Sequence, residues 1–325
     1  MRGSAGAPEV SVVLGVYNGA AVLSETLDSV LSQQGVAFEI VAVDDGSTDA
    51  TADILSAYAA RDGRLRVLKQ SNQGLTRALI RGCDEARGTF IARQDAGDIS
   101  LPGRLATQSA QLRGQARAVV TSCATRIVGP KGEMLTIVRQ EPGQWQHALE
   151  QLDRERPMGP SHHGATMFVR EAYLAAGGYR AQFRVAQDID LWSRMVEQGE
   201  CLSDPKVLYE AKLIEGSISA RKRRDQMRAL DIVIACSTVR RHGDGDSELI
   251  GRLTESGGFS LADWRPDGLT AAEFNYFVGS MLRRSDPARA NTYFRKGLLR
   301  WPLHLRSWVG WTRTLPKTLR KAAAT

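Results

Sequence analysis

An alternation of apolar strands and amphipathic helices through the first 110 residues limits the fold of this 325-residue chain more than any other feature. Four short apolar runs, typical of buried strands, are each followed by a segment with helical periodicity. The strands are expected at Val10–Val16, Phe38–Val43, Leu65–Leu68 and Phe90–Arg93. The pattern predicts an α/β fold with a mostly parallel sheet and helices on both faces, because consecutive parallel strands need a crossover connection.

Polar and acidic residues follow three of these strands at their carboxyl ends, namely Tyr17-Asn18, Asp44-Asp45 and Asp95 with Asp98. Ligands of such sheets bind beyond the carboxyl ends of the strands. We therefore expect these side chains to share one site although they lie far apart in the sequence. Carboxylates in that place can bind a hard cation such as Mg²⁺ or Mn²⁺, or accept hydrogen bonds from sugar hydroxyls.

The adjacent carboxylates of Asp44 and Asp45 repel each other, which favours a functional role for the pair. The alternative is a structural one, in which they cap the helix that starts near Asp49. Arg77 and Arg93 are candidates for contacts with a diphosphate, and an ordinary helix-surface or ion-pair role fits them equally.

The alternation weakens in the second half of the chain. Short runs at Ala118–Ser122, Arg126–Val128 and Leu135–Val138 predict antiparallel strands, and a further strand is expected at Ala165–Val169. Neighbouring side chains on a strand point to opposite faces, so His162 and His163, which lead into that last strand, are not expected to bind one metal together. Asp188 opens a helix, and from about residue 220 the chain is expected to be all-helical.

Charge divides the chain into two parts. Residues 1–220 hold 23 Lys and Arg against 26 Asp and Glu, whereas residues 221–325 hold 20 basic against 10 acidic residues. We therefore expect an α/β domain over residues 9–220 and a basic helical region over residues 221–325. The run Arg221–Arg224 could be a solvated helix start or could contact lipid or phosphate.

Three of the six tryptophans, Trp301, Trp308 and Trp311, lie close together among arginines. Tryptophan with arginine on a short amphipathic segment is typical of an interfacial helix at an anionic membrane. The alternative is that the tryptophans pack on the catalytic domain and the basic residues face solvent. A nucleic-acid-binding protein is the least favoured class: the pI is about 9.4, but no nucleic-acid module is visible.

Several features are expected to be absent. No apolar run approaches the length of a membrane-spanning helix, about 20 residues. Residues 1–8 have no apolar segment and do not resemble a signal peptide. The four cysteines have no metal-type spacing and predict reduced thiols in a cytoplasmic protein, which could sit peripherally at the inner face of the cell membrane.

Six motifs together resemble those of family 2 glycosyltransferases, in the same order and spacing and over about residues 9–215. They are Ser11–Leu14 with Val16-Tyr17-Asn18, Val43–Asp49, Asn72–Leu75, Ile91–Asp95, Gly177-Gly178-Tyr179 and Gln187–Trp192. The resemblance implies a GT-A fold, the Rossmann-like fold of nucleotide-diphospho-sugar transferases, here with an α-helical C-terminal extension. It also implies a nucleotide-sugar donor of the UDP, dTDP or GDP type and an inverting mechanism.

The resemblance also implies roles for individual residues. Tyr17 would stack on the base of the donor with Asn18 beside it, and Asp45 would bond to the base edge next to Asp44. Asp95 would open the metal motif and contact the ribose or sugar. Asp188 would be the general base, and His163 would lie near the donor phosphates or the acceptor.

Two positions depart from the family pattern. Gly97 stands where the family usually has the carboxylate that is its main metal ligand, so Asp98 or a water would have to replace it, or no metal is needed. Gln187 stands where the family usually has Glu before the base. Asp188 itself could serve as the N-cap of its helix rather than, or as well as, the base.

The sequence therefore predicts an inverting glycosyltransferase that moves a sugar from a nucleotide donor to a hydroxyl of a glycan or a lipid-linked glycan. Its cofactor would be a divalent cation, Mn²⁺ or Mg²⁺. A homologue that binds the donor without transferring the sugar is the alternative that Gly97 keeps open.

Overall fold

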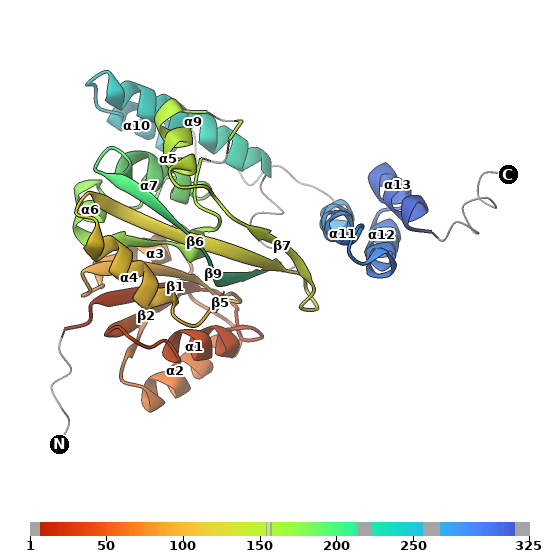
Figure 1. Cartoon of the computed structure of the whole chain (residues 1–325), viewed down its shortest axis with the longest axis horizontal. Coiled ribbons are helices and arrows are strands. Elements are labelled where there is room, and N and C mark those ends of the chain that lie inside the picture. Colours follow the sequence, from red (N-terminus) through yellow and green to blue (C-terminus); the bar gives the residue numbers. More distant parts are fainter. Residues whose placement is uncertain (1–6, 154, 157, 214–222, 256–266, 316–325) are drawn as a thin grey trace. The chain divides into compact units, whose positions relative to one another are not determined.

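The computed structural model describes residues 7–315 except 154, 157, 214–222 and 256–266 (Figure 1). The chain forms two compact units. The first comprises residues 1–126, 137–211 and 224–259, and the second residues 127–136, 212–223 and 260–325. Residues 224–255 pack with the first unit, although the sequence grouped them with the basic C-terminal region.

The four expected strands form the parallel half of the sheet in the first unit. They are β1 (Val10–Val16), β2 (Phe38–Asp44), β3 (Leu65–Lys69) and β4 (Phe90–Asp95). β1 lies in the centre and pairs in parallel with both β2 and β4, and β2 pairs in parallel with β3. The expected parallel sheet is confirmed. Every residue of β1 is buried, as its β-branched sequence predicts for a strand covered on both faces.

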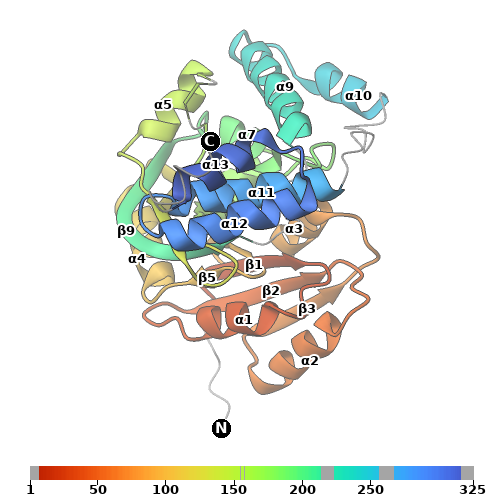
Figure 2. The same cartoon turned by 90° about the vertical axis from the view of Figure 1, so that its right-hand side faces the viewer.

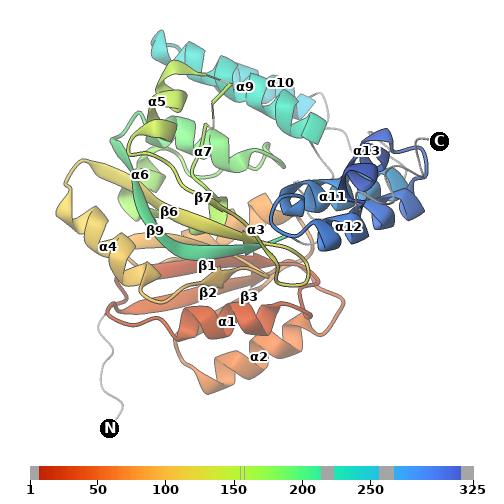
Figure 3. The same cartoon turned by 45° about the vertical axis from the view of Figure 1, so that its right-hand side comes forward.

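Two helical layers cover this half of the sheet (Figure 3). Alternate β1 residues point to opposite faces: Val12 and Leu14 pack toward α1 (Leu23–Leu31), α2 (Thr51–Arg61) and α4 (Arg104–Gly114), and Val13 packs toward α3 (Leu75–Asp84). A Cβ atom on Gly82 of α3 would lie 2.6 Å from Val13 Cγ1. This glycine therefore lets α3 approach the sheet closely.

Antiparallel strands extend the sheet beyond β4 in the order β3-β2-β1-β4-β8-β6-β9-β5, with β7 paired to β6. Their bounds are β5 (Ile99–Ser100), β6 (Ala118–Val128), β7 (Met134–Val138), β8 (Met167–Val169) and β9 (Glu200–Lys212). β8 pairs antiparallel with β4 and β6, and β5 pairs antiparallel with β9. The two strands expected within 118–128 form one strand, because the residues between them are also mostly buried and continue the ladder.

Short helices line this second half: α5 (Gln144–Gln151), the 3₁₀ turn η1 (His163–Ala165), α6 (Arg170–Ala175) and α7 (Gln187–Met195). The expectation of a strand from Ala165 was wrong, since His163–Ala165 form the turn and the strand begins only at Met167. Two further helices of the first unit, α9 (Arg223–Arg241) and α10 (Ser247–Glu255), contribute Val233 and Ile250 to a core with Phe183 and Val185.

The second unit contains α11 (Asp267–Leu282), α12 (Pro287–Arg300) and α13 (Leu305–Thr314), which lie side by side in Figure 2. It also contains the turn between β6 and β7. A small core unites Leu135 of β7 with Phe274, Val278 and Phe294. A Cβ atom on Gly279 or on Gly310 would collide with the Phe294 ring. The two glycines therefore leave the space that this ring occupies.

All four cysteines are free and buried, as expected. Burial raises the pKa of the Cys83 thiol to about 12, and the pKa values of Cys123 and Cys236 to about 11. Thiols with such pKa values stay protonated at neutral pH and are unreactive.

Candidate active site

The carboxyl ends of β1, β2 and β4 meet at one edge of the sheet, as the sequence predicted. Val16 is in register with Asp44, and Gly15 is in register with Asp95. Tyr17, directly after β1, exposes 51% of its surface. Its ring is therefore available for stacking at the edge where the acidic residues gather.

The loop after β2 is bonded to the residue that follows Tyr17. Asn18 adopts a left-handed backbone with φ 51°. Its backbone N–H donates to Ser47 Oγ at 3.0 Å, and its side-chain Oδ1 accepts from the Thr48 N–H at 2.8 Å. These bonds hold the 45–51 loop against the end of β1.

Asp44 and Asp45 are both buried and both accept hydrogen bonds from the chain itself. Asp44 Oδ1 accepts from the Ser47 N–H. Asp45 Oδ1 accepts from Gln70 Nε2 and the Gln73 N–H, and Oδ2 accepts from the Gly74 N–H at 2.8 Å. Asp45 thereby links the end of β2 to the loop before α3.

The alternative that this pair caps the following helix was wrong. The helix α2 starts at Thr51, whose N–H donates to Asp49 at 3.0 Å. Arg77 lies exposed in the first turn of α3, which follows Gly74 directly. The loop that Asp45 holds therefore also sets the start of α3 and, with it, the position of Arg77.

Three possible metal-binding side chains gather at the end of β4. Oxygens of Asp95 and Asp98 and a ring nitrogen of His162 all lie within 4.8 Å of one another. The His162 Nδ1 atom is 3.8 Å from Asp95 Oδ2 and 3.7 Å from Asp98 Oδ2. The sequence predicted Asp95 and Asp98 but not His162, because it placed the two histidines on a strand. The turn η1 instead begins right after His162.

Gly97, between the two aspartates, has φ 100°, which glycine adopts without strain. Its N–H donates to Thr26 Oγ1 at 2.9 Å. An aspartate in this backbone conformation would be strained. The conformation therefore accounts for the glycine, and it leaves Asp98 as the second carboxylate of the cluster.

Tyr209 of β9 braces this cluster and was not predicted. Its hydroxyl donates to Asp98 Oδ2 at 3.0 Å and accepts from the Asp95 N–H at 3.2 Å. Its ring stacks on His162 at 5.6 Å, and the buried Arg104 guanidinium lies 4.7 Å from the ring centre. A Cβ atom on Gly164 would collide with the Tyr209 hydroxyl and lie 3.0 Å from Asp95 Oδ2.

Arg93 is an internal partner of Asp95. It is completely buried, and its guanidinium lies 2.5 Å from Asp95 Oδ1 and also donates to the Val13 carbonyl. Of the two roles open to Arg93, the structure has the ion pair. Burial raises the pKa of Asp95, but Arg93 and His162 outweigh burial and hold that pKa below its ordinary value. Asp95 is therefore ionised at neutral pH.

His163 shares one neighbour with Asp95, since Arg93 Nε donates to His163 Nε2 at 3.4 Å. Its Nε2 atom lies 2.7 Å from the Tyr179 hydroxyl, and its ring makes an edge contact with Trp192 of α7. Burial, followed by the positive charge of Arg93, lowers the pKa of His163 well below its ordinary value. His163 is therefore neutral at physiological pH.

Asp188 occupies the second position of α7 and is half-buried. Ala186, with φ 54°, is the N-cap residue of this helix, so the alternative that Asp188 is the cap was wrong. Burial raises the pKa of Asp188, and backbone N–H groups of Ile189 and of Asp188 itself partly oppose this rise. The charge of Asp95 raises the pKa of Asp188 further, and His162 lowers it.

Buried ion pairs hold α7 in place. Asp190 and Arg194 pair at 2.6 Å on the inner face of the helix, and Arg180 lies 3.6 Å from Asp190. Arg180 in turn pairs with Asp246 at 2.8 Å, just before α10. Gln187, beside Asp188, is buried. Asp188 therefore belongs to a helix that buried ion pairs hold in place.

The fold and these sites define a family. The model of the family described as Glycosyl transferase family 2 matches residues 11–174, half of the chain. The chain belongs to this family, and its α/β sheet with a helical C-terminal part is the GT-A fold.

Among its relatives is EpsE of Bacillus subtilis (strain 168), a protein whose name marks it as a glycosyltransferase. It is 34% identical over 199 residues, which are 59% of this chain and 68% of EpsE. Chondroitin synthase of Pasteurella multocida is 23% identical over 72% of this chain but only 23% of its own length. The crystal structure of S. aureus TarS 1–349 in complex with UDP-GlcNAc has the same fold, with a TM-score of 0.55 and 17% identity over 97% of this chain and 92% of TarS 1–349.

Among the helices that the structure describes, none combines the length and the apolar character needed to cross a membrane.

Proposed function

We propose that this glycosyltransferase moves a sugar from a nucleoside-diphosphate donor to a hydroxyl of a glycan or lipid-linked glycan, with inversion at the anomeric carbon. One observation carries the proposal: Asp95, Asp98 and His162 gather at the end of β4, and the neighbouring His163 contacts Trp192 of α7, the helix that carries Asp188. A base and a group of diphosphate-side ligands are thus available in one site.

The nucleoside would bind at the ends of β1 and β2. Tyr17 would stack on the base through its exposed ring, and Asn18 would hold the loop that faces it. Asp45 accepts three hydrogen bonds from the chain, and a carboxylate can accept about four, so one acceptor position remains for a donor at the base edge. Arg77 is exposed and available to a diphosphate oxygen.

Asp95, Asp98 and His162 fit a divalent cation, which we place at this cluster. Two carboxylates and one imidazole suit Mn²⁺, which accepts both oxygen and nitrogen ligands. Mn²⁺ or Mg²⁺ would offset the negative charge of the departing diphosphate. Tyr209 and Arg93 orient the two carboxylates, and the neutral His163 would face the phosphate or acceptor side without adding charge.

Asp188 would act as the general base in a single displacement. The acceptor oxygen would attack the anomeric carbon while the bond from that carbon to the phosphate oxygen breaks, and the bonding electrons would leave with the diphosphate. The acceptor proton would pass to Asp188. A raised pKa suits this role, because a base works best when its pKa approaches the working pH. One displacement from the opposite face inverts the anomeric centre.

Calorimetric titration with UDP, GDP and dTDP, each with and without Mn²⁺, tests the donor part of the proposal. UDP comes first, because the similarly folded TarS has been crystallised with it. Metal-dependent binding of one nucleotide is the expected result. Metal-independent binding would favour the second candidate, a homologue that binds the donor without transfer, which the glycine at position 97 supports. Binding of none would end the nucleotide-sugar proposal.

We further propose that the second unit associates with an anionic membrane surface, where a lipid-linked acceptor would be found. The tryptophans predicted for this role lie partly inside the unit: Trp301 and Trp311 are half-buried, and Trp308 is 43% exposed. Leucines provide more exposed apolar surface than the tryptophans do. The basic run at 221–224 lies outside the residues whose side chains the structure describes.

A further inference from the structure

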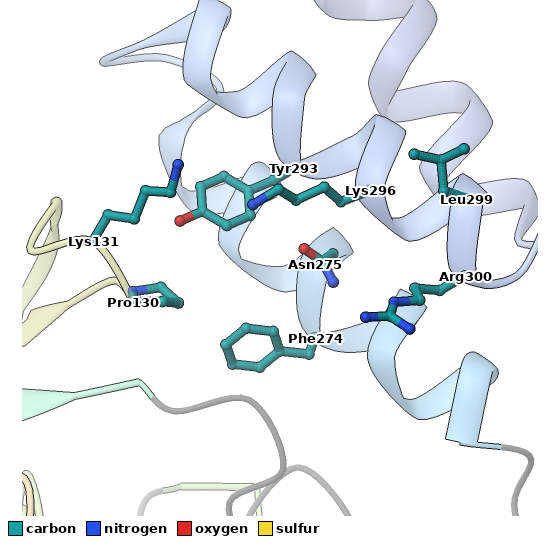
Figure 4. A pocket seen from close by; sticks show the side chains of 8 residues that line it. All are labelled: Pro130, Lys131, Phe274, Asn275, Tyr293, Lys296, Leu299 and Arg300. Carbon is teal, nitrogen blue, oxygen red and sulfur yellow. The ribbon is translucent and has the colours of Figure 1, made fainter. Parts of the chain in front are cut away.

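A basic cavity of about 260 Å³ lies within the second unit (Figure 4). The turn between β6 and β7 contributes Lys131 to its wall, α11 contributes Phe274, and α12 contributes Tyr293, Lys296 and Arg300. All of these residues belong to one compact unit. The cavity contains none of the side chains of the transferase site.

The three cations of this cavity, Lys131, Lys296 and Arg300, are exposed, and none of them forms an ion pair with a described residue. The nearby carboxylate of Glu133 is held by two residues of the cavity wall: Oε1 accepts from the Tyr293 hydroxyl at 2.8 Å, and Oε2 accepts from the Lys131 backbone N–H at 2.9 Å. Three cations against this one carboxylate leave the cavity with an excess of positive charge, which favours an anion.

One exposed leucine lines the cavity, and two more follow it closely in the chain. Leu299 is the lining residue and is 81% exposed, and Leu303 and Leu305, just after α12, are 79% and 76% exposed. Single exposed leucines are ordinary, but three within seven residues beside a basic cavity form an amphiphilic surface. A soluble polyanion such as a nucleic acid would make no use of these leucines, whereas a membrane lipid would match both the cations and the leucines.

The size of the cavity also favours the phosphate of a lipid over a larger ligand. Pockets for drug-sized ligands usually measure about 300–1,000 Å³, and this cavity lies below that range. It suits one phosphate with a small attached group rather than a whole nucleotide-sugar.

We propose that this cavity binds the phosphate of an anionic membrane lipid while Leu299, Leu303 and Leu305 enter the boundary between headgroups and acyl chains. Lys131, Lys296 and Arg300 would surround the phosphate, with the ring of Phe274 on the side of α11. This inference deepens the membrane association proposed above, and it requires nothing of the donor site.

Flotation of the full chain with phosphatidylcholine vesicles, with and without phosphatidylglycerol, tests the proposal. We expect binding only to the vesicles that contain phosphatidylglycerol. Lys296→Gln with Arg300→Gln should weaken it roughly thirtyfold, since each cation at an anionic surface accounts for about fivefold. The matched control, Arg283→Gln with Arg284→Gln, removes two exposed cations outside the cavity and should weaken binding less than about threefold.

A second pair of variants tests the apolar part. Leu303→Asn with Leu305→Asn should lower the bound fraction at equal lipid concentration, whereas Leu174→Asn, at a leucine that is 50% exposed in the first unit, should not. Thermal unfolding and UDP titration of every variant should match the wild type. Those two readouts separate the lipid site from folding and from the donor site.

Three outcomes would overturn the proposal. One is an equal loss of vesicle binding in the cavity pair, Lys296→Gln with Arg300→Gln, and in the control pair, Arg283→Gln with Arg284→Gln. That result would mean that positive charge attracts the vesicle wherever it lies on the surface. Another is equal binding to vesicles with and without phosphatidylglycerol. The third is tight, saturable binding of inorganic phosphate without any vesicle binding, which would make the cavity a site for a free anion.

Discussion

The proposed nucleotide side of the site and its acidic side are built in opposite ways. Around Tyr17, Asn18 and Asp45, polar side chains bond mainly to backbone N–H groups of neighbouring loops. Around Asp95 and Asp188, charged side chains face buried charged or aromatic partners, and their pKa values shift. The difference teaches that the first region sets the shape of a binding surface and the second sets protonation states. Changes in the two regions should therefore damage different quantities.

Asp188→Asn should have the largest effect. We expect turnover, measured as release of the nucleoside diphosphate in the presence of acceptor, to fall about 10²- to 10⁴-fold because the base is lost. Donor affinity by calorimetry should be unchanged. Asp53→Asn, which changes an exposed carboxylate in the first turn of α2, is the control. Full turnover in Asp188→Asn would remove the base assignment.

Asp98→Ala should have the second-largest effect. We expect Mn²⁺-dependent donor binding to weaken more than about a hundredfold, since loss of even an outer-shell partner of a metal ligand costs 10- to 100-fold. Binding measured with a chelator present should be the same in variant and wild type. If the metal dependence of the variant equals that of the wild type, Asp98 does not replace the missing carboxylate.

The pH dependence of kcat/KM should also distinguish the two regions. Asp188 must be ionised to act as a base, so kcat/KM should fall about tenfold per pH unit below its raised pKa. Donor affinity should not follow the same curve. Because the folded chain binds this proton more tightly than the unfolded chain, Asp188 contributes stability at low pH that is lost as pH rises through its folded pKa. Asp188→Asn should therefore raise the melting temperature at neutral pH, and an unchanged or lower melting temperature would contradict this.

Asp45→Ala should act on the nucleotide side and on stability together. It leaves the Gln73 and Gly74 N–H groups without their partner, which costs about 1–3 kcal/mol for each such group that stays buried. We expect a lower denaturation midpoint and weaker donor binding. Asp45→Asn keeps one acceptor oxygen and should recover part of both losses. Equal midpoints for Asp45→Ala and the wild type would contradict the anchoring role.

Tyr17→Ala should have the smallest effect. Loss of one stacked aromatic ring should weaken nucleotide binding roughly tenfold. Stability should hardly change, because the ring is half exposed and no described bond depends on it. Tyr17→Phe should bind like the wild type. Equal affinity in Tyr17→Ala would place the base elsewhere.

The sequence predicted the parallel half of the fold well, because strand and helix periods differ and their alternation permits few topologies. Asp95 and Asp98 were found for the same reason, since their place at a strand end follows directly from the pattern. Asp188 was found only through a motif, because helical periodicity does not mark a base. Its alternative role as a helix cap failed because the N-cap of α7 is Ala186, two residues before Asp188.

The second half of the site could not be predicted in this way. His162 lies beside Asp95 and Asp98 just before a 3₁₀ turn that occupies the expected start of the strand, and short turns leave no periodic signal. Tyr209 donates a hydrogen bond to Asp98, which lies 111 positions earlier in the sequence. The antiparallel strands bring the two residues together, and no local sequence pattern specifies the order of those strands. For Arg93 the sequence left a phosphate contact and an ion pair equally open, because the sequence does not reveal its complete burial beside Asp95.

The buried thiols have a practical consequence. Cys83, Cys123, Cys201 and Cys236 all belong to the first unit, and the second unit has no cysteine. A thiol-labelling reagent therefore reports the opening of the first unit alone, without any engineered probe. Trp301, Trp308 and Trp311 contribute fluorescence from the second unit, alongside Trp145 and Trp192 of the first unit, so a fluorescence change that thiol labelling does not match reports the second unit. One denaturation series followed by both signals would tell whether the two units unfold as one cooperative body or in separate steps.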